Sequence, residues 1–211
     1  MIAPAALLAR ARALAGPERV LLGITGPPGA GKSTVSEWLV RRLNAKGGPV
    51  AAYVPMDGFH LSNLVLESLG LRDRKGSPPT FDAAGFAALL ARLRAGGGPV
   101  YAPRFHREIE ESIAAEIAVG PEVRLVVVEG NYLLLDEPDW RPVRAALHEV
   151  WYLDAPDDVL AERLLNRRLL AEPDRDLAQA WLDFNDLPNA RLIRTTRARA
   201  DAVLEVGPLD G

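Results

Sequence analysis

The chain has no cysteine and only three lysines in 211 residues, and its three histidines show no metal-ligand spacing. Without cysteine it can form no disulfide, no thiolate metal site and no cysteine nucleophile. GTPase switches read the base through an Asn-Lys-x-Asp element, which needs a lysine. None of the three lysines lies in such a motif, which argues against a GTPase switch; they are Lys32, Lys46 and Lys75. A net charge of −3 lacks the basic surplus typical of nucleic-acid binding, so we expect no nucleic-acid partner.

Long apolar runs are absent too, since none approaches the roughly 20 residues that a bilayer-spanning helix needs. The opening stretch MIAPAALLARARALAG lacks the basic start of a signal peptide, and Arg10 and Arg12 interrupt its apolar residues. We therefore expect a cytoplasmic protein without a membrane partner. The stretch is predicted to form an amphipathic helix, because its apolar residues follow helical spacing. These residues are Leu7, Leu8, Ala11, Leu14 and Ala15.

Short apolar runs alternate with helical patterns along the chain. VLLGIT is a candidate for a short buried strand, and LVVVEG is apolar up to Glu129, which is typical of parallel strands covered on both faces. A helical pattern from Pro156 to about Ala171 and others like it imply right-handed β-α-β crossovers. The sequence thus predicts an α/β fold, a three-layer α/β/α arrangement of the P-loop NTPase type with a five-stranded parallel sheet. The predicted strands are residues 20–25, 50–55, 125–130, 149–156 and 201–206.

The length suits a single domain over residues 1–211. Residues 58–122 are too long for a connector, so they are predicted to form an inserted substrate-side region. This region is expected to hold two or three helical segments and two loops, KGSPPTFD and GGGPVYAPRFHRE. Residues 163–186 combine arginines with later Pro and Asp residues and are predicted to form a mobile lid that excludes water.

The first predicted strand runs into GPPGAGKST, which fits the G-x-x-x-x-G-K-[ST] phosphate-loop (Walker A) pattern. Its glycines let backbone N–H groups surround phosphates, and the following helix adds its positive dipole end. Lys32 is predicted to reach the β- and γ-phosphates, and Ser33 to offer a hydroxyl to Mg²⁺. A chance glycine-rich turn would lack the flanking strand and helix. The expected nucleotide-binding residues are Gly26, Pro27, Pro28, Gly29, Ala30, Gly31, Lys32, Ser33 and Thr34.

Two carboxylates follow predicted strands near this loop, Asp57 after the second and Glu129 at the end of the third. Ligands of such sheets sit beyond the carboxyl ends of the strands. Asp57 is therefore predicted to orient or deprotonate an attacking hydroxyl and to help hold Mg²⁺. Glu129 is predicted to face Mg²⁺ and the substrate, because a buried acid needs a cation or hydrogen bonds. The alternatives are a turn or helix cap for Asp57 and a solvent-facing position for Glu129.

The insertion carries further polar candidates for a small-molecule site. Asp82 either caps the helix that follows it or holds substrate hydroxyls. One predicted loop gathers the aromatic ring of Tyr101, the imidazole of His106 and the guanidinium groups of Arg104 and Arg107. We expect Tyr101, Arg104 and His106 to contact the substrate. The alternative is a solvated loop with Tyr101 on the core. His60 is assigned an orienting role at the substrate or a surface position, since no second ligand stands at metal-binding spacing.

Arg163 and Arg167 stand four residues apart, on one face of the predicted helix. Arginines beside a phosphate site can clamp the transferring group through bidentate hydrogen bonds. We therefore expect both to act in catalysis, with Arg163 also contacting the substrate and Arg168 contacting the nucleotide. The alternative is an exposed charged helix in which Glu162 and Asp158 are the partners of these arginines.

With these residues in place, the chain resembles the uridine kinase, phosphoribulokinase and pantothenate kinase family of P-loop kinases from Val20 to Val206. It is most similar to a bacterial subgroup of nucleoside/nucleotide kinases and fructose transport kinase-like proteins. The phosphate loop is generic, whereas the Phe-Asp pair that ends at Asp82 and the spacing from Tyr101 to His106 are more specific. The resemblance implies that Asp57 is the general base.

The resemblance further implies an ATP- and Mg²⁺-dependent kinase that phosphorylates a hydroxyl of a nucleoside-like or sugar-like small molecule. The segment AEPDRDLAQAWLDFNDLPN departs from the arginine-glycine lid of uridine kinases. The acceptor therefore stays open, and pantothenate and fructose are alternatives. A nucleotide-binding regulatory ATPase without an acceptor is a second alternative, and the sequence leaves a homo-oligomer open.

Overall fold

In the computed structural model, which describes residues 1–45, 47–170 and 173–209, five strands form one sheet. Its neighbouring strands all run parallel in the order β2-β5-β1-β6-β7. The predicted five-stranded parallel sheet is confirmed, and each predicted strand overlaps an observed one. The strands are β1 (Val20–Thr25), β2 (Ala51–Pro55), β5 (Leu125–Glu129), β6 (Glu149–Leu153) and β7 (Ala202–Leu204).

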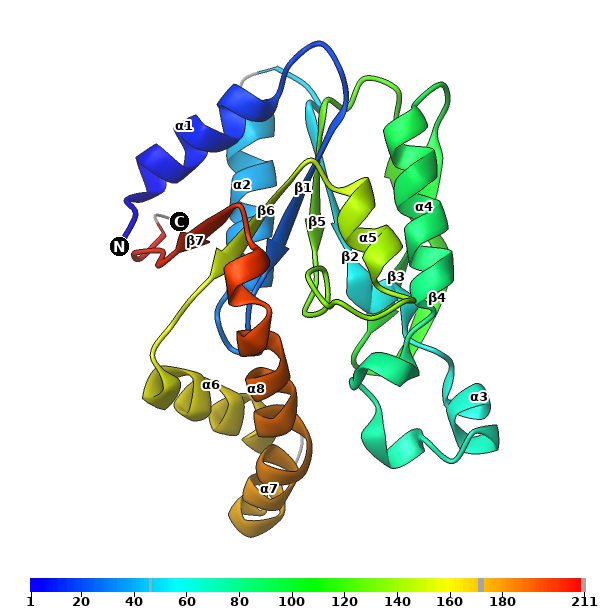
Figure 1. Ribbon diagram of the computed structural model, residues 1–211, viewed down its shortest axis with the longest axis vertical. Coiled ribbons are helices and arrows are strands. Elements are labelled where there is room, and N and C mark those ends of the chain that lie inside the picture. The colour runs from blue at the N-terminus through cyan, green and yellow to red at the C-terminus, as the bar shows by residue number, and fades with distance from the viewer. Residues whose placement is uncertain (46, 171–172, 210–211) are drawn as a thin grey trace.

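Helices cover both faces of this sheet (Figure 1). Successive residues of β5 belong alternately to two hydrophobic clusters: Val126 and Val128 to one, Leu125 and Val127 to the other. Because side chains alternate across a strand, a strand covered on both faces must be apolar throughout. The sheet is thus the middle layer of the predicted three-layer fold. The covering helices are α4 (Ala83–Ala95) and α5 (Arg141–Ala146) on one face, and α1 (Pro4–Leu14) and α2 (Lys32–Asn44) on the other.

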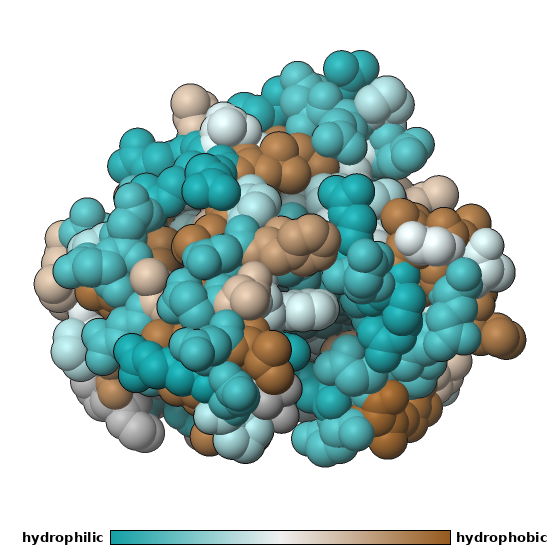
Figure 2. All heavy atoms as spheres, turned by 90° about the horizontal axis from the view of Figure 1, so that it is seen from below, coloured by the Kyte–Doolittle hydropathy of each residue, from teal (hydrophilic) through white to brown (hydrophobic). Residues whose placement is uncertain are grey.

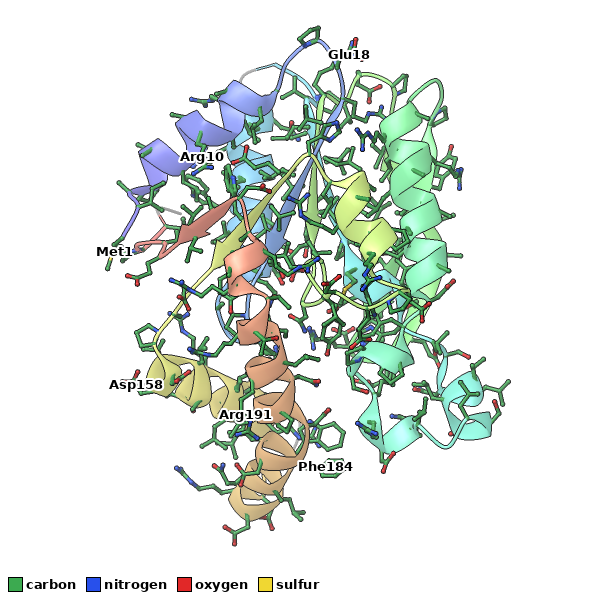
Figure 3. All side chains as sticks on the ribbon, viewed as in Figure 1. Met1, Arg10, Glu18, Asp158, Phe184 and Arg191 are labelled. Carbon is green, nitrogen blue, oxygen red and sulfur yellow. The ribbon has the colours of Figure 1, made fainter. Side chains whose placement is uncertain are left out.

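The N-terminal helix α1 packs through Leu7 and Ala11, both fully buried. Arg10 points from this helix toward β6, and its guanidinium lies 5.0 Å from the centre of the Trp151 ring and pairs with Glu149 (Figure 3). The predicted amphipathic helix is therefore confirmed. Within the described residues, no helix is long and apolar enough to cross a membrane.

The insertion between β2 and β5 corrects one prediction. The stretch GGGPVYAPRFHRE, interpreted as a loop, contains β3 (Val100–His106), which pairs antiparallel with β4 (Glu111–Val119) in a separate two-stranded sheet. This hairpin could not be predicted from the sequence for two reasons. Pro103 interrupts β3 where the register shifts, and the alanine-rich β4 is largely exposed and so lacks a regular apolar pattern. The other elements of this region are α3 (Asn63–Ser68) and the 3₁₀ turns Met56–Phe59, Arg72–Arg74 and Pro78–Thr80.

After β6 the chain forms a group of helices that extends below the sheet in the view of Figure 1. The helix that follows Pro156 ends at Leu169, and Ala171, its predicted end, lies outside the described residues. A π-helix then joins α7 to α8 without a break. Such π-helical turns are rare and frequently lie at functional sites. The elements are α6 (Asp157–Leu169), α7 (Arg175–Trp181), the π-helix Leu182–Asp186, α8 (Leu187–Thr195) and the 3₁₀ turn Arg197–Arg199.

Candidate functional site

The phosphate loop joins the end of β1 to the first turn of α2. Gly26 has a φ of 142°, and a Cβ at this position would stand 2.3 Å from the carbonyl oxygen of Leu153. Only glycine fits such a conformation and contact. Gly31, with a φ of 86°, is the N-cap of α2 and offers no side chain to cover the first N–H groups of the helix. Those N–H groups and the positive end of the helix dipole form an anion-binding site.

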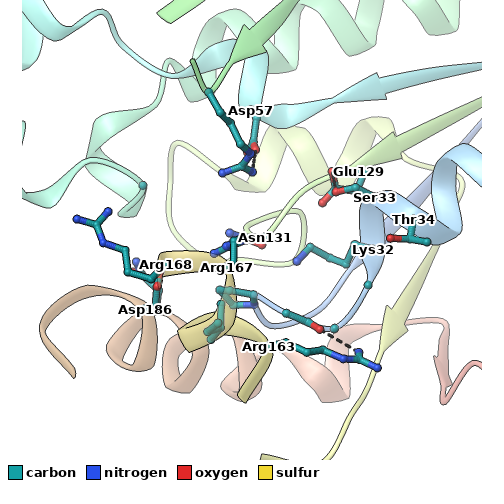
Figure 4. A pocket seen from close by; sticks show the side chains of 18 of the residues that line it. Lys32, Ser33, Thr34, Asp57, Glu129, Asn131, Arg163, Arg167, Arg168 and Asp186 are labelled. Atoms are coloured by element: carbon teal, nitrogen blue, oxygen red, sulfur yellow. Dashed lines mark hydrogen bonds and ion pairs between the residues drawn. The ribbon is translucent and has the colours of Figure 1, made fainter. Parts of the chain in front are cut away.

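Lys32 places its ammonium group inside this loop. Its Nζ donates a hydrogen bond to the carbonyl oxygen of Pro27 at 3.1 Å, and only 6% of the residue is exposed. Burial lowers the pKa of Lys32, whereas the negative charges of Glu129 and Asp57 act in the opposite direction. Figure 4 shows the side chain directed from the loop into a cavity. A cation in this position can meet phosphates that the loop amides hold.

Glu129 lies at the end of β5 and is buried, which excludes the solvent-facing alternative. Its Oε2 accepts hydrogen bonds from the Tyr53 hydroxyl at 2.9 Å and from the Ser33 hydroxyl at 3.3 Å. Burial raises the pKa of Glu129, and the positive charge of Lys32 acts against this rise. Sequence reasoning missed Tyr53, because a tyrosine in a strand gives no signal that distinguishes a site contact from core packing.

The oxygen atoms around Glu129 fit a magnesium ion. A hydroxyl from Ser33 and a carboxylate from Glu129 lie within hydrogen-bond distance, and Asp57 contributes a second nearby carboxylate. Among the described residues, no group of three or more acidic or histidine side chains forms a complete metal cage. Mg²⁺ is usually bound in this partial way, by one or two carboxylates with water and substrate phosphates completing its shell.

Asp57 lies in the 3₁₀ turn directly after β2, beside Glu129, because Pro55 pairs in register with Glu129. Its side chain is 33% exposed and forms an ion pair with Arg107, whose Nη2 lies 3.4 Å from Oδ2. Asp57 thus reaches the cavity from the sheet edge predicted for it, with an arginine as its partner rather than a backbone cap (Figure 4).

A cavity of about 1230 Å³ joins the phosphate loop to the insertion and to the helices after β6. Figure 2 views the molecule from this end, where a mostly hydrophilic surface surrounds a hollow. Gly26 and Pro27 of the loop are not among the lining residues. The predicted residues that do line the cavity are Pro28, Gly29, Ala30, Gly31, Lys32, Ser33, Thr34, Asp57, His60, Glu129, Arg163, Arg167 and Arg168.

His60 forms part of the cavity wall between two aromatic rings. Its ring centre lies 4.0 Å from that of Phe81 and 4.5 Å from that of Phe105. Its Nδ1 lies 2.8 Å from the carbonyl oxygen of Asp57, so the tautomer that carries a proton on Nδ1 donates to this oxygen. Burial lowers the pKa of His60, which favours the neutral ring. The contact fixes the backbone that carries Asp57.

Four predicted substrate residues lie outside the lining of this cavity. Asp82 is exposed and caps α4, accepting a hydrogen bond from the backbone N–H of Gly85 at 2.8 Å. Tyr101 is 52% exposed. Arg104 and His106 both contact Glu116 of the neighbouring strand, at 3.1 and 2.6 Å. None of these four side chains lines the cavity in this structure. A contact between them and the substrate therefore remains a prediction.

The residues that line the cavity from β3 and the turn after it are Phe105, Arg107 and Glu110. Of these, Arg107 belongs to the residues that the sequence singled out, whereas Phe105 and Glu110 do not. Successive side chains of a strand point to opposite faces. Phe105 therefore lines the cavity, whereas its sequence neighbours Arg104 and His106 do not. Sequence reasoning identified the correct segment but treated it as a loop, in which this alternation gives no guidance. The strand pattern of β3 was the signal that could have selected Phe105.

The arginines of α6 lie where the helical spacing predicted, on one side of the cavity (Figure 4). Arg163 donates to the carbonyl oxygen of Gly29 in the phosphate loop at 3.1 Å. Arg167 lines the cavity together with Asp186 and Asp57, and the negative charges of both acids act on it. Arg168 stacks on Trp181 with its guanidinium carbon 4.4 Å from the ring centre. Two cations therefore face the loop and the Asp57 carboxylate from the helical side.

The π-helix contributes two cavity residues that sequence reasoning missed, Asn185 and Asp186. Asn185 is buried and donates from Nδ2 to the backbone oxygen of Lys75 at 3.1 Å, which links the helices to the insertion. Burial raises the pKa of Asp186, and Arg167 and Arg168 act against this rise. A π-helical turn rotates the residues that follow it, so an α-helical pattern could not have placed these side chains.

Comparison with known proteins gives a partial match to one family model and matches to individual proteins that cover most of the chain. The sequence profile of the family "Methylmalonyl Co-A mutase-associated GTPase MeaB" matches residues 2–58. This span carries the phosphate loop and its flanking strands and ends at residue 58, where the predicted insertion begins. Because the loop motif is shared by proteins of many activities, this match indicates nucleotide binding rather than a particular reaction.

Several of the longer matches are with kinases. The "Putative uridine kinase C227.14" of Schizosaccharomyces pombe is 32% identical over 199 residues, which cover 89% of this chain and 83% of that protein. A pantothenate kinase of Shouchella clausii is 30% identical over 215 residues, which cover 89% and 68%. The crystal structure of a "putative fructose transport system kinase" from Silicibacter sp. TM1040 superposes with a TM-score of 0.88 at 41% identity, covering 97% of this chain and 100% of that one. The chain therefore belongs to the family of P-loop kinases that includes uridine kinases and pantothenate kinases.

Proposed function

We propose that the protein is an ATP- and Mg²⁺-dependent kinase that transfers the γ-phosphoryl group to a hydroxyl of a nucleoside-like or sugar-like small molecule. One observation carries this proposal. A single cavity contains the phosphate loop, a carboxylate at the sheet edge and arginines from the opposite wall. Phosphoryl transfer needs these components, because catalysis rests on positioning the reactants and on stabilising charge.

The nucleotide would bind at the loop end of the cavity. The loop amides and Lys32 would hold the phosphates, and Ser33 and Glu129 would hold Mg²⁺, whose contribution when bound is to neutralise charge on the transferring group. Tyr53 keeps the Glu129 carboxylate oriented through its hydrogen bond at 2.9 Å. Arg163 and Arg168 would contact the nucleotide from the helical wall.

Asp57 would accept the proton of the acceptor hydroxyl. The hydroxyl oxygen then forms a bond to the γ-phosphorus, the bond between that phosphorus and the oxygen it shares with the β-phosphate breaks, and ADP leaves with the electron pair. Arg107 and Arg167 would stabilise the negative charge of the transferring group, which is supported by the interaction of both with the Asp57 carboxylate. The predicted lid, residues 163–186, includes most of α6, α7 and the π-helix and would exclude water during transfer.

The acceptor is the less determined part of the reaction. The names of the relatives point to different alcohols, since one is a pantothenate kinase and another is described as a fructose transport system kinase. Both are kept as alternative acceptors. The remaining alternative, a regulatory ATPase without an acceptor, predicts nucleotide hydrolysis that no alcohol changes.

The test is ADP release from Mg-ATP with uridine, cytidine, fructose, ribulose 5-phosphate and pantothenate as candidate alcohols, with product masses measured by mass spectrometry. We expect slow ADP release without an acceptor, and one alcohol that accelerates it and gains the mass of a phosphoryl group. ADP release at the same rate with every alcohol, and only inorganic phosphate as product, would favour the regulatory ATPase.

A further inference from the structure

The acceptor end of the cavity contains a buried cation that the proposed reaction does not use. Lys75 lies in the loop KGSPPTFD, lines the cavity and is only 7% exposed. Its Nζ donates to Oδ1 of Asn63 at 2.6 Å and to the backbone oxygen of Glu110 at 2.5 Å, and lies 5.2 Å from the centre of the Phe105 ring. These partners are neutral oxygens and an aromatic face. Within the described part of the chain, no carboxylate forms an ion pair with Lys75.

A covered ammonium group without a counter-ion is costly, because it loses hydration that neutral partners replace only in part. Burial lowers the pKa of Lys75, and the charges of Glu110 and Glu111 offset this from a distance. Neither acid forms an ion pair with the lysine. Glu111 accepts from the backbone N–H of Asn63, and Glu110, which also lines the cavity, contacts Lys75 through its backbone oxygen. An ammonium group has three donors, so one remains for a ligand.

A second cation lies beside Lys75. Arg72 lines the same end of the cavity, is exposed, and acts electrostatically on Lys75 as a like charge. No acid forms an ion pair with Arg72 among the residues that the structure describes. Two like charges at one end of a cavity repel each other. An anion bound between them would attract both cations and so offset this repulsion.

Two aromatic contacts connect Asp57 to Lys75 along the cavity wall. The Nδ1 of His60 lies 2.8 Å from the carbonyl oxygen of Asp57, and the His60 ring lies 4.5 Å from the ring of Phe105. The Nζ of Lys75 lies 5.2 Å from the centre of that same Phe105 ring. A molecule whose hydroxyl meets Asp57 would pass His60 before it reaches Lys75. The Asn185 hydrogen bond to the Lys75 backbone brings the helices over this end.

We propose that Lys75 and Arg72 form an anion subsite and that the acceptor is therefore an alcohol that carries a carboxylate or phosphate group. This inference rests on the proposed kinase function and narrows its substrate class. The acceptor hydroxyl is held at Asp57, and its anionic group is held at Lys75 and Arg72. A neutral nucleoside or free sugar would leave Lys75 without its counter-ion.

The first experiment measures binding and does not depend on catalysis. Thermal stabilisation is recorded with glycerate and with inorganic phosphate, in the presence of saturating Mg²⁺ and a non-hydrolysable ATP analogue that already fills the phosphate loop. We expect both anions to raise the Tm of the wild type and of Arg92→Met, whose arginine is exposed on α4. Lys75→Met and Arg72→Met should lose this anion-dependent shift. An unchanged shift in both Lys75→Met and Arg72→Met would overturn the subsite, and if Lys75→Met does not fold, Arg72→Met decides.

The second experiment compares matched acceptors: glycerol with glycerate, fructose with fructose 6-phosphate, and ribose with ribose 5-phosphate. We expect the anionic member of at least one pair to be phosphorylated faster than its neutral partner. For that acceptor, Lys75→Met should raise KM about 10- to 100-fold with little change in kcat, as expected for the loss of a charge-assisted contact to the ground state. Lys75→Arg should recover part of the loss.

The outcomes separate this inference from the kinase proposal. A neutral alcohol phosphorylated best, with a KM that Lys75→Met leaves unchanged, would refute the subsite and keep the kinase. Hydrolysis without any acceptor would refute the kinase, and the anion-binding result alone would then decide whether the subsite exists.

Discussion

Asp57 and Glu129 are neighbours at the same sheet edge, yet their surroundings differ. Glu129 is buried and accepts hydrogen bonds from Ser33 and Tyr53, whereas Asp57 is partly exposed and faces Arg107. Fixed hydroxyl partners suit a carboxylate that holds a metal ion, and an open position suits one that must meet an incoming hydroxyl. The environments therefore support the different roles that we propose for these two carboxylates.

Replacing Asp57 by asparagine tests its assigned role. Asp57→Asn should bind nucleotide like the wild type and lower turnover by about 10²–10⁴-fold, the usual contribution of a general acid or base. Acceptor-dependent ADP release gives turnover, and calorimetric titration gives nucleotide affinity. Asp139→Asn, on an exposed loop, is the matched control. Turnover near that of the control would remove Asp57 from the mechanism.

Lys32 should affect binding and catalysis together. Lys32→Ala removes the cation inside the phosphate loop, so nucleotide affinity should fall and turnover should drop by about 10²–10³-fold, as for other donors that stabilise charge in the transition state. The same titration and rate measurements apply, with Arg41→Ala on the exposed side of α2 as control. Wild-type affinity in Lys32→Ala would contradict the assigned role of the loop.

Among the elements, those that bury continuous apolar runs could be predicted. VLLGIT and LVVVE form β1 and β5, and the arginine spacing of α6 placed Arg163 and Arg167 on the cavity side. The hairpin β3–β4 could not be predicted as readily, because exposed strands bury too little to need a regular pattern. The positions of the cavity residues Asn185 and Asp186 depend on a π-helical turn, and no periodicity in the sequence predicts such a turn.

A single buried arginine joins several of these elements. Arg19, just before β1, donates to the backbone oxygens of Val123, Leu93 and Gly120 at 3.0, 3.1 and 2.6 Å, and only 8% of it is exposed. It therefore ties the end of α4 and the turn before β5 to the start of β1. No acid takes part in these three hydrogen bonds.

Removing this arginine should destabilise the fold. Arg19→Met keeps the aliphatic stem but leaves buried carbonyl oxygens without donors, so the free energy of unfolding should fall by about 1–3 kcal/mol. Urea denaturation measures this change, and Arg92→Met should remain within about 0.5 kcal/mol of the wild type as an exposed substitution. Equal stability of the two variants would show that water replaces the guanidinium without loss.

At the scale of the whole molecule, stability should depend on pH near neutrality. His148 accepts a hydrogen bond on Nδ1 from the backbone N–H of Leu21 at 3.0 Å, which a protonated Nδ1 cannot do. Partial burial, together with the positive charge of Arg94, lowers the pKa of His148 below its ordinary value of 6.5, and burial lowers the pKa of His60 in the same direction. The unfolded chain therefore binds more protons than the folded chain in this range.

Stability from these histidines should be complete above about pH 6.5 and should fall as the pH drops toward the lowered pKa of the folded state. Glu129 and Asp186 act in the opposite sense, since burial raises the pKa of both. The difference between the wild type and His148→Asn isolates the histidine, because the asparagine oxygen can accept from Leu21 at any pH. Tm measured from pH 5 to 8 should vary less in the variant, and parallel curves would refute this role.

The hydrogen bond from Asn185 to the backbone of Lys75 has a thermodynamic consequence for ligand binding. It ties the helices whose arginines face the phosphate loop to the loop that carries Lys75. If binding at one end shifts these helices, the free energy of that shift enters the affinity at the other end. Linkage then requires reciprocity: whatever factor the nucleotide applies to acceptor affinity, the acceptor must apply to nucleotide affinity. In that case the hydrogen bond from Asn185 to Lys75 would be measured as cooperative binding of the nucleotide and the acceptor.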